Sequence, residues 1–169
     1  MTSQSEELES SVDEGGEVAC LLLPTLALPV LVPNVVVAEV LLSVAIQKED
    51  QFPWLLGWTQ WRGVEVPVLS YESLQDEERS VADNAFAKVA VFHSMNPEGA
   101  FLFYGVRLAG NPKLMAVAAH HVGEEGELGD SMLGTAAEVD GLEVVIPDLT
   151  SLEKKLKEVV KPLPMDPVL

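Results

Sequence analysis

Short apolar segments, interrupted by proline, glycine, asparagine and aspartate, restrict the fold of this chain more than any other feature of its sequence. They cover residues 18–23, 28–32, 40–46, 54–60 and 64–70, and then 86–93, 100–108, 113–122 and 142–147. Short apolar runs bounded by turn residues are typical of β-strands. Because helical patterns do not alternate with these runs, a parallel βαβ fold is disfavoured and closed or paired antiparallel sheets remain. The sequence therefore predicts a mainly β protein.

One segment late in the sequence has the pattern of a helix. Residues 150–153 (Thr-Ser-Leu-Glu) form a capping-box pattern, and Leu152, Leu156 and Val159 then fall on one helical face. Lysines gather towards the end of this segment, where they suit the negative end of the helix dipole, and Pro162 stops the pattern. We expect a terminal helix that docks on the β core through its apolar face.

Composition divides the chain into a folded domain and two tails. Residues 1–16 are rich in serine and glutamate and lack apolar periodicity, which predicts a disordered acidic tail. The folded domain is expected over residues 17–161, and residues 162–169 form a C-terminal tail. A polar, acidic stretch at 72–84 separates two similar sets of predicted strands, so we place a lobe boundary there. The acidic, glycine-rich stretch 124–134 is expected to be a loop.

The chain is strongly acidic, with 10 Lys and Arg against 27 Asp and Glu and a net charge of −17. This charge repels phosphate backbones and anionic bilayers, so neither nucleic acid nor a membrane is an expected partner. Residues 18–38 are uncharged and long enough to span a bilayer, but Pro24, Pro29 and Pro33 favour two short strands instead. The N-terminus lacks the positive region of a secretory signal, and the single cysteine, Cys20, suits a reduced compartment. We expect a cytoplasmic protein.

The sequence contains few groups suited to catalysis. His120 and His121 are adjacent, so on a strand they face opposite sides and do not chelate one metal ion. His93 ends an apolar segment with no pattern of ligands around it, and Cys20 lies among alanine and leucine, which predicts a buried, inert thiol. No phosphate-binding glycine loop, nucleophile elbow or HExxH motif occurs. We therefore expect no enzymatic activity, no metal and no cofactor.

Two isolated charges stand in otherwise apolar surroundings. Glu39 lies in the valine-rich stretch 35–42, and Arg62 lies between a tryptophan and a glycine in the stretch 58–64. An unpaired charge in an apolar interior costs several kcal/mol, so each side chain must reach water or find an opposite charge. We hypothesise that Glu39 and Arg62 pair with each other. The alternative is that each simply points into solvent from a half-exposed strand.

Three tryptophans, Trp54, Trp58 and Trp61, lie close together in the sequence. If residues 54–60 form a strand, Trp54 and Trp58 share one face and Trp61 takes the other, so we expect that they do not all belong to the core. Tryptophan supplies rigid, amphipathic surface that often anchors protein interfaces. At least one of them is therefore a candidate for an exposed binding surface, with core packing as the alternative.

The order of these residues resembles a known family. Residues 34–40 (Asn-Val-Val-Val-Ala-Glu-Val), 53–57 (Pro-Trp-Leu-Leu-Gly) and 61–69 (Trp-Arg-Gly-Val-Glu-Val-Pro-Val-Leu) resemble the first half of a CheW-like domain, the coupling module of bacterial chemosensory arrays. Residues 87–93, 115–122 and 142–149 are similar to later strands of that family, and the resemblance covers residues 17–160. The sequence around the tryptophans is more similar to the ChpC type of type IV pilus chemosensory systems than to standard CheW.

The resemblance implies two intertwined five-stranded SH3-like β-barrels with a hydrophobic seam between them, a C-terminal helix and no catalytic centre. It also implies a non-enzymatic adaptor that binds the regulatory domain of a CheA-type histidine kinase and the cytoplasmic tip of a methyl-accepting chemoreceptor, in chemotaxis or twitching motility. The alternative is a divergent CheW-like module that binds other proteins, or self-associates, without a kinase. The predicted protein-binding site combines positions that match the family with two neighbouring tryptophans. Its residues are Val37, Glu39, Gly57, Trp58, Trp61, Arg62 and Gly63.

Overall fold

The computed structural model describes residues 16–75, 86–96, 98–118, 122–128 and 131–159, and only the main chain of residues 75, 122–128 and 131–133. Two curled sheets of six strands each make up most of the described chain. Across sheet A the strands are β10 (Val122–Leu128), β11 (Ser131–Val139), β12 (Leu142–Pro147), β2 (Val30–Pro33), β1 (Glu17–Leu23) and β9 (Lys113–Ala118). Across sheet B they are β3 (Val37–Ala45), β7 (Phe86–His93), β8 (Phe103–Leu108), β6 (Val64–Leu69), β5 (Leu55–Trp61) and β4 (Gln47–Lys48). The predicted mainly β class is confirmed.

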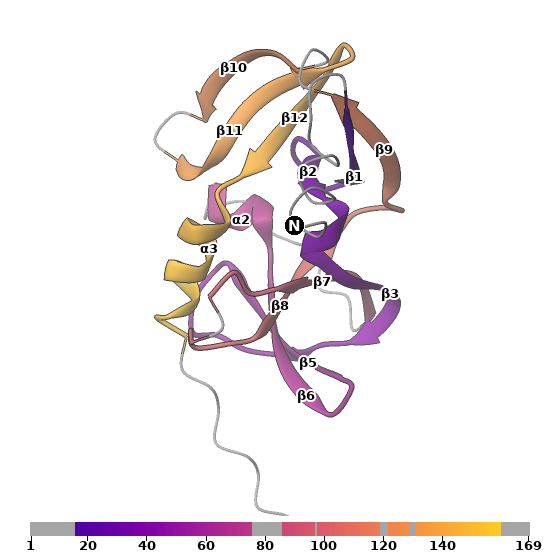
Figure 1. Cartoon of the computed structure of the whole chain (residues 1–169). Coiled ribbons are helices and arrows are strands. Elements are labelled where there is room, and N and C mark those ends of the chain that lie inside the picture. Colours follow the sequence, from indigo (N-terminus) through magenta and orange to yellow (C-terminus); the bar gives the residue numbers. More distant parts are fainter. Residues whose placement is uncertain (1–15, 76–85, 97, 119–121, 129–130, 160–169) are drawn as a thin grey trace, which may run out of the picture.

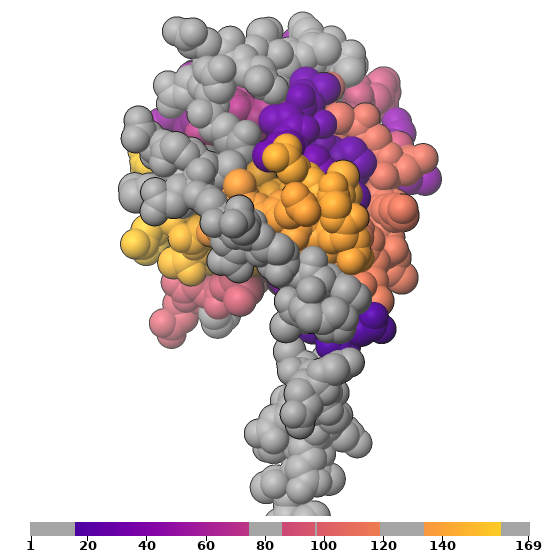
Figure 2. All heavy atoms as spheres, turned by 90° about the horizontal axis from the view of Figure 1, so that it is seen from above, coloured from indigo at the N-terminus to yellow at the C-terminus, as the bar shows by residue number. Residues whose placement is uncertain are grey.

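The two sheets are intertwined along the sequence, as expected. β1 and β2 belong to sheet A, the short 3-10 helix η1 (Asn34–Val36) leads into sheet B, and the chain returns to sheet A at β9. Figure 1 shows sheet A in the upper half of the molecule and sheet B in the lower half. In Figure 2, which looks down on sheet A, indigo residues from the start of the described chain lie beside orange residues of β11 and β12, consistent with the pairing of β12 with β2.

Each sheet contains one strand more than the five that were expected. The two-residue strand β4 pairs with β5 and completes sheet B, although its polar sequence has no strand pattern. The stretch 124–134, predicted to be a loop, instead contributes to β10 and β11, so that prediction was wrong. These strands are part of an antiparallel ladder with β12, which the two-residue turn Asp140-Gly141 connects to β11. Both turn residues have positive φ, 51° and 82°, as a type I′ hairpin turn requires.

The stretch 72–84, where the sequence suggested a lobe boundary, lies between strands that both belong to sheet B. β6 precedes it, the short helix α2 (Tyr71–Gln75) includes its first residues, and β7 follows it. Residues 76–85 are outside the described part of the chain, as are most of the acidic tail and all of the C-terminal tail. The described chain changes sheet at η1 and again between β8 and β9.

The largest apolar cluster lies where the two sheets and the last helix meet. Sheet A contributes Leu23 and Val145, sheet B contributes Phe92 and Val106, and the helix α3 (Leu149–Leu156) contributes Leu152. Smaller clusters consist of residues of sheet A alone or of sheet B alone. Because sheet B has apolar contacts on both faces, its strands carry little of the simple alternation of a half-exposed sheet. No helix in the described segments has the length and apolar character needed to cross a membrane.

The terminal helix docks as predicted but is capped differently. Leu152, Leu156 and Val159 are all buried. The N-cap is Asp148, whose side chain accepts a hydrogen bond of 3.1 Å from the main-chain N–H of Ser151, so the predicted capping box at 150–153 was wrong. The carboxylate of the expected capping partner, Glu153, instead accepts hydrogen bonds from the turn after β7, including one of 2.7 Å from the N–H of Met95. This contact fixes α3 to sheet B.

Candidate functional site

Glu39 and Arg62 come together at one end of sheet B. Glu39 lies on β3, just after a β-bulge in its pairing with β7. Arg62 lies in the two-residue turn between β5 and β6, which is flanked by the pair Trp61 and Val64. Arg62 Nη2 lies 3.2 Å from Glu39 Oε1, so the hypothesised ion pair is confirmed.

Trp61 completes this arrangement, which we call the Glu39–Trp61–Arg62 cluster. Its indole Nε1 donates a hydrogen bond of 2.9 Å to Glu39 Oε1, the same oxygen that Arg62 contacts. The guanidinium carbon of Arg62 lies 4.9 Å from the centroid of the Trp61 ring, which is a cation–π contact. The carboxylate and the aromatic ring therefore both hold the guanidinium in place.

The ion pair lies at the surface and not in the apolar interior suggested by the surrounding sequence. The side chain of Arg62 is 70% exposed and that of Glu39 is 41% exposed. Exposed pairs of this kind contribute only about 0.2–1 kcal/mol to stability. The bond from Trp61 is stronger because hydrogen bonds to a charged group contribute about 1.5–3 kcal/mol. Glu39 is thus mainly a structural partner of Trp61, whereas most of the Arg62 side chain faces solvent.

The backbone at Arg62 is unusual for an arginine. Arg62 has φ 50° and Gly63 has φ 78°, which together form a type I′ turn. Asparagine, aspartate and glycine favour the first of these positions, whereas other residues there cost about 1 kcal/mol. A long cationic side chain in this place is therefore not explained by the stability of the turn.

The two predicted glycines have different structural roles. At Gly57, with φ 151°, a Cβ atom would overlap the main-chain oxygen of Gln47, so a side chain cannot fit where β4 approaches β5. At Gly63 a Cβ atom would meet no atom within 4 Å, and only the turn conformation requires glycine. Val37, at the start of β3, is half-buried and packs against the core between the sheets. The structure therefore groups Glu39, Trp61, Arg62 and Gly63, and places Gly57 at the other end of β5.

All three tryptophans are buried, so the expectation that they do not all belong to the core was wrong. Trp54 and Trp58 do share a cluster, between the sheets, and Trp61 does belong to a different one, with Val66 and Val91 of sheet B. The prediction of faces was therefore sound, but both faces of β5 are covered. Residues of β3, β7 and β8 in the curled sheet B cover the face with Trp61. Residues of α3 and sheet A cover the face with Trp58.

Two aromatic residues extend the cluster and were not identified from the sequence. The ring of Phe103 on β8 meets Trp61 edge-on at a centroid distance of 4.8 Å, and His93 on β7 lies 5.5 Å from Phe103. These residues are distant in sequence from Trp61, and only the register of β7 with β8 brings them together. His93 is exposed, whereas His120 and His121 lie outside the described residues. Within those residues, no group of three or more His, Cys, Asp or Glu side chains is placed to hold a metal ion.

Two further polar groups, Cys20 and Glu72, are buried. Cys20 is buried, as predicted, and this burial raises the pKa of its thiol. Glu72 on α2 is only 3% exposed, and its carboxylate accepts hydrogen bonds of 2.7 Å from the N–H of Leu26 and 3.1 Å from Ser70 Oγ. Because Leu26 lies in the loop between β1 and β2, Glu72 joins sheet B to sheet A. The spacing of residues in the sequence contains no signal for this contact.

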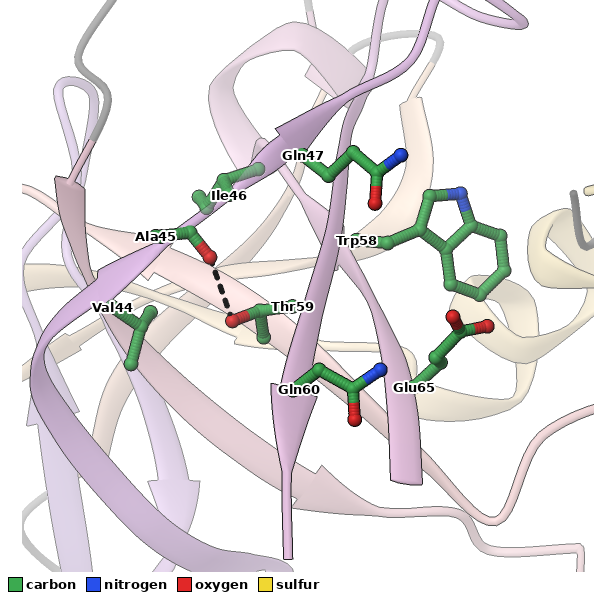
Figure 3. A pocket seen from close by; sticks show the side chains of 8 residues that line it. All are labelled: Val44, Ala45, Ile46, Gln47, Trp58, Thr59, Gln60 and Glu65. Atoms are coloured by element: carbon green, nitrogen blue, oxygen red, sulfur yellow. Dashed lines mark hydrogen bonds between the residues drawn. The ribbon is translucent and has the colours of Figure 1, made fainter. Parts of the chain in front are cut away.

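A groove of about 420 Å³ lies between the end of β3, β4 and β5. Its lining residues are Val44, Ala45, Ile46, Gln47, Trp58, Thr59, Gln60 and Glu65. Figure 3 shows the side chains of Gln47, Gln60 and Glu65 arranged around the indole of Trp58, and Thr59 Oγ1 donating to the main-chain oxygen of Ala45 at 2.9 Å. Trp58 is 4% exposed, and its indole Nε1 is buried without a hydrogen-bond partner.

These features define a class of protein, a mainly β domain of two intertwined curled sheets with an exposed acid–base pair at one end. No protein-family model matches the chain, and no curated protein sequence matches it. Among solved structures, the scaffolding protein TtCheW from Thermoanaerobacter tengcongensis is similar, with a TM-score of 0.62 and 12% sequence identity over 79% of this chain and 90% of that chain. The chain therefore has a CheW-like fold, as the resemblance implied.

Proposed function

We propose that this chain is a non-enzymatic adaptor that couples chemoreceptors to a CheA-type histidine kinase, and that the Glu39–Trp61–Arg62 cluster contacts these partners. The similarity in fold to a protein described as a scaffold supports the general role. The resemblance to the ChpC type favours a cytoplasmic pathway that controls type IV pilus (twitching) motility, with flagellar chemotaxis as the other setting. Val37, Gly57, Trp58 and Gly63 act in this proposal by shaping sheet B around the contact surface.

The observation that carries the proposal is the position of Arg62. Its backbone conformation favours other residues, and its side chain makes one ion pair, of 3.2 Å, within the described part of the chain. A guanidinium has five N–H donors, so most of its hydrogen-bonding capacity faces solvent. The Trp61 ring and the Glu39 carboxylate limit its motion, which lowers the entropy lost when a partner binds. A rigid, exposed arginine beside a carboxylate is well suited to recognise a complementary charged pair on another protein.

Binding assays with three substitutions test the proposal. Arg62→Asn removes the charge and keeps a residue that the turn favours, and Glu39→Gln keeps an acceptor for Trp61 Nε1 while removing the ion pair. Asp140→Asn is the matched control, because Asp140 occupies the same position in the type I′ turn of sheet A. We expect Arg62→Asn to weaken binding to the kinase regulatory domain about tenfold, the effect of losing about 1.4 kcal/mol. Glu39→Gln should cause a smaller loss, and Asp140→Asn none.

Wild-type affinity in both Arg62→Asn and Glu39→Gln, with the fold intact by circular dichroism, would contradict the assignment of the contact surface. If the wild-type chain binds no candidate kinase or receptor tip but associates with itself in sedimentation, the divergent CheW-like module is the better description. The first result would reject only the contact surface, whereas the second would reject the adaptor role itself.

A further inference from the structure

A row of four planar side chains crosses the end of sheet B that carries the Glu39–Trp61–Arg62 cluster. The guanidinium carbon of Arg62 lies 4.9 Å from the centroid of the Trp61 ring. The centroids of the Trp61 and Phe103 rings are 4.8 Å apart, and those of Phe103 and His93 are 5.5 Å apart. This row, which we call the Arg62–His93 row, therefore has a cation at one end, an imidazole at the other and aromatic rings between them.

Both ends of the row face solvent. The side chain of Arg62 is 70% exposed, and His93 is exposed at the end of β7. In the described part of the chain, the Arg62 side chain donates only to Glu39, and the imidazole of His93 takes part in no hydrogen bond. A guanidinium has five N–H donors and a neutral imidazole has one, so most donors of the row are available to a partner.

The middle of the row offers apolar surface. Phe103 is only half-buried, and Val64, which lies opposite Trp61 in the pairing of β5 with β6, is 43% exposed. Because opposite residues of a ladder point to the same face, Val64 shares the face of sheet B on which Trp61 meets Phe103. An apolar side chain of a partner therefore finds carbon surface beside the polar ends of the row.

Charge complementarity indicates an acidic partner. The chain has a net charge of −17, yet the row carries an exposed guanidinium and no carboxylate of its own. Glu39, which touches the row, is already bonded to Trp61 Nε1 and Arg62 Nη2 through one oxygen. A guanidinium binds a carboxylate more strongly than a neutral acceptor, and an imidazole N–H also donates to a carboxylate. A basic partner segment would leave these donors unused.

We propose that the Arg62–His93 row binds an extended acidic segment of a partner protein, an inference that rests on the proposed contact surface. One carboxylate of the segment accepts from Arg62, a second accepts from His93, and an apolar side chain between them packs on Phe103. Residues four positions apart in an extended strand are separated by about 13 Å, which the three successive contacts of 4.9, 4.8 and 5.5 Å can span. The segment therefore has two acidic residues four positions apart and an apolar residue midway.

Both ends of the row are held in place before a partner binds. Arg62 lies in a type I′ turn and stacks on an indole ring. His93 pairs with Phe103 in the ladder of β7 with β8, and the turn that follows is fixed to α3 by the hydrogen bond of 2.7 Å from the N–H of Met95 to Glu153. Because the two ends are already ordered, little side-chain entropy is lost when the segment binds.

Titration of the full-length, isotope-labelled chain with a synthetic peptide tests the proposal. The peptide is acetyl-Thr-Glu-Thr-Leu-Thr-Glu-Thr-amide, and the NMR signals followed are the indole N–H of Trp61 and the main-chain N–H of His93. We expect saturable shifts of both signals. Replacing one glutamate of the peptide by glutamine should weaken binding about threefold, and replacing both by lysine should abolish it.

Three variants of the chain locate the binding site. Arg62→Asn and His93→Leu should each weaken binding of the peptide about threefold. In His93→Leu, one of the two glutamates should become replaceable by glutamine without further loss, because its partner has been removed. Lys113→Gln is the matched control, since it removes an exposed positive charge from β9 in sheet A, and it should bind the peptide as wild type does.

Absence of shifts at peptide concentrations of several millimolar, equal binding of the lysine peptide, or wild-type affinity in either Arg62→Asn or His93→Leu would overturn the proposal. The titration contains no kinase and no receptor, so these results would leave the proposed adaptor role standing. Conversely, peptide binding by a chain that forms no complex with a kinase or a receptor tip would support the acidic-segment site and reject the adaptor role.

Discussion

Replacing Arg62 by asparagine should separate the stability of the fold from the recognition of partners. The substitution removes an exposed ion pair, about 0.2–1 kcal/mol, and an exposed cation–π contact, about 0.5–1 kcal/mol. It also relieves the cost of a left-handed arginine at φ 50°, about 1 kcal/mol. Because these contributions nearly cancel, we expect the free energy of unfolding of Arg62→Asn to lie within about 1 kcal/mol of wild type.

Urea unfolding followed by tryptophan fluorescence measures this difference. With an m-value of about 2 kcal/mol/M, the midpoint should shift by no more than about 0.5 M. Arg62→Ala loses the same contacts without a residue that favours the turn, so it should be about 1 kcal/mol less stable than Arg62→Asn. If Arg62→Asn loses more than about 2 kcal/mol, or if the alanine and asparagine variants are equally stable, the arginine has a structural role and the reasoning is refuted.

Three further predictions concern the framework around the site. Gly57→Ala should lower the free energy of unfolding by more than about 2 kcal/mol in the same urea assay, because the new Cβ overlaps main chain. Gly63→Ala should lower it by only about 1 kcal/mol, because its Cβ enters open space. Equal losses in the two variants would contradict this reasoning. Tyr104→Phe should leave stability unchanged or raise it by about 1 kcal/mol, because the buried hydroxyl has no partner in the described chain, and a clear loss would reveal one. The N–H of Ser151 holds the pKa of Asp148 below its usual value. The capping contribution of Asp148 to the free energy of unfolding, about 1 kcal/mol, should therefore be complete above pH ~3.9, the pKa of aspartate in the unfolded chain. It should disappear as the pH falls through the lower pKa of the folded state. The stability difference between wild type and Asp148→Ala, measured from pH 7 to 2, should shrink accordingly, and a constant difference would argue against it.

Most of the strands could be predicted because their apolar residues and turn signals are local. The stretch 124–134 could not be recognised by apolar content, since glutamate and glycine dominate it and its strands are held by pairing with β12. The turn residues Asp140-Gly141 are a strong hairpin signal and would have indicated β11. The polar strand β4 depends entirely on its contact with β5 across Gly57, which is a tertiary feature.

Part of the candidate site could be predicted from the sequence, but Phe103, His93 and the surroundings of the ion pair could not. An acid and a base in apolar sequence surroundings indicated the pairing of Glu39 with Arg62, whereas their exposure follows from a bulge in β3 and a left-handed turn. The faces of the tryptophans followed from strand periodicity, but their burial depends on how sheet B curls and on what covers its outer face. The contact of Trp61 with Phe103 depends on strand register, which spacing in the sequence does not encode.

Formation of a ternary complex is the most direct test of the central claim that this chain links two other proteins. The measurement is sedimentation velocity of the full-length chain mixed with the regulatory domain of a CheA-type kinase and the cytoplasmic tip of a chemoreceptor. The account predicts one species that contains all three proteins, and loss of that species with Arg62→Asn but not with Asp140→Asn. A chain that binds neither protein, or that releases one when the other binds, would contradict it.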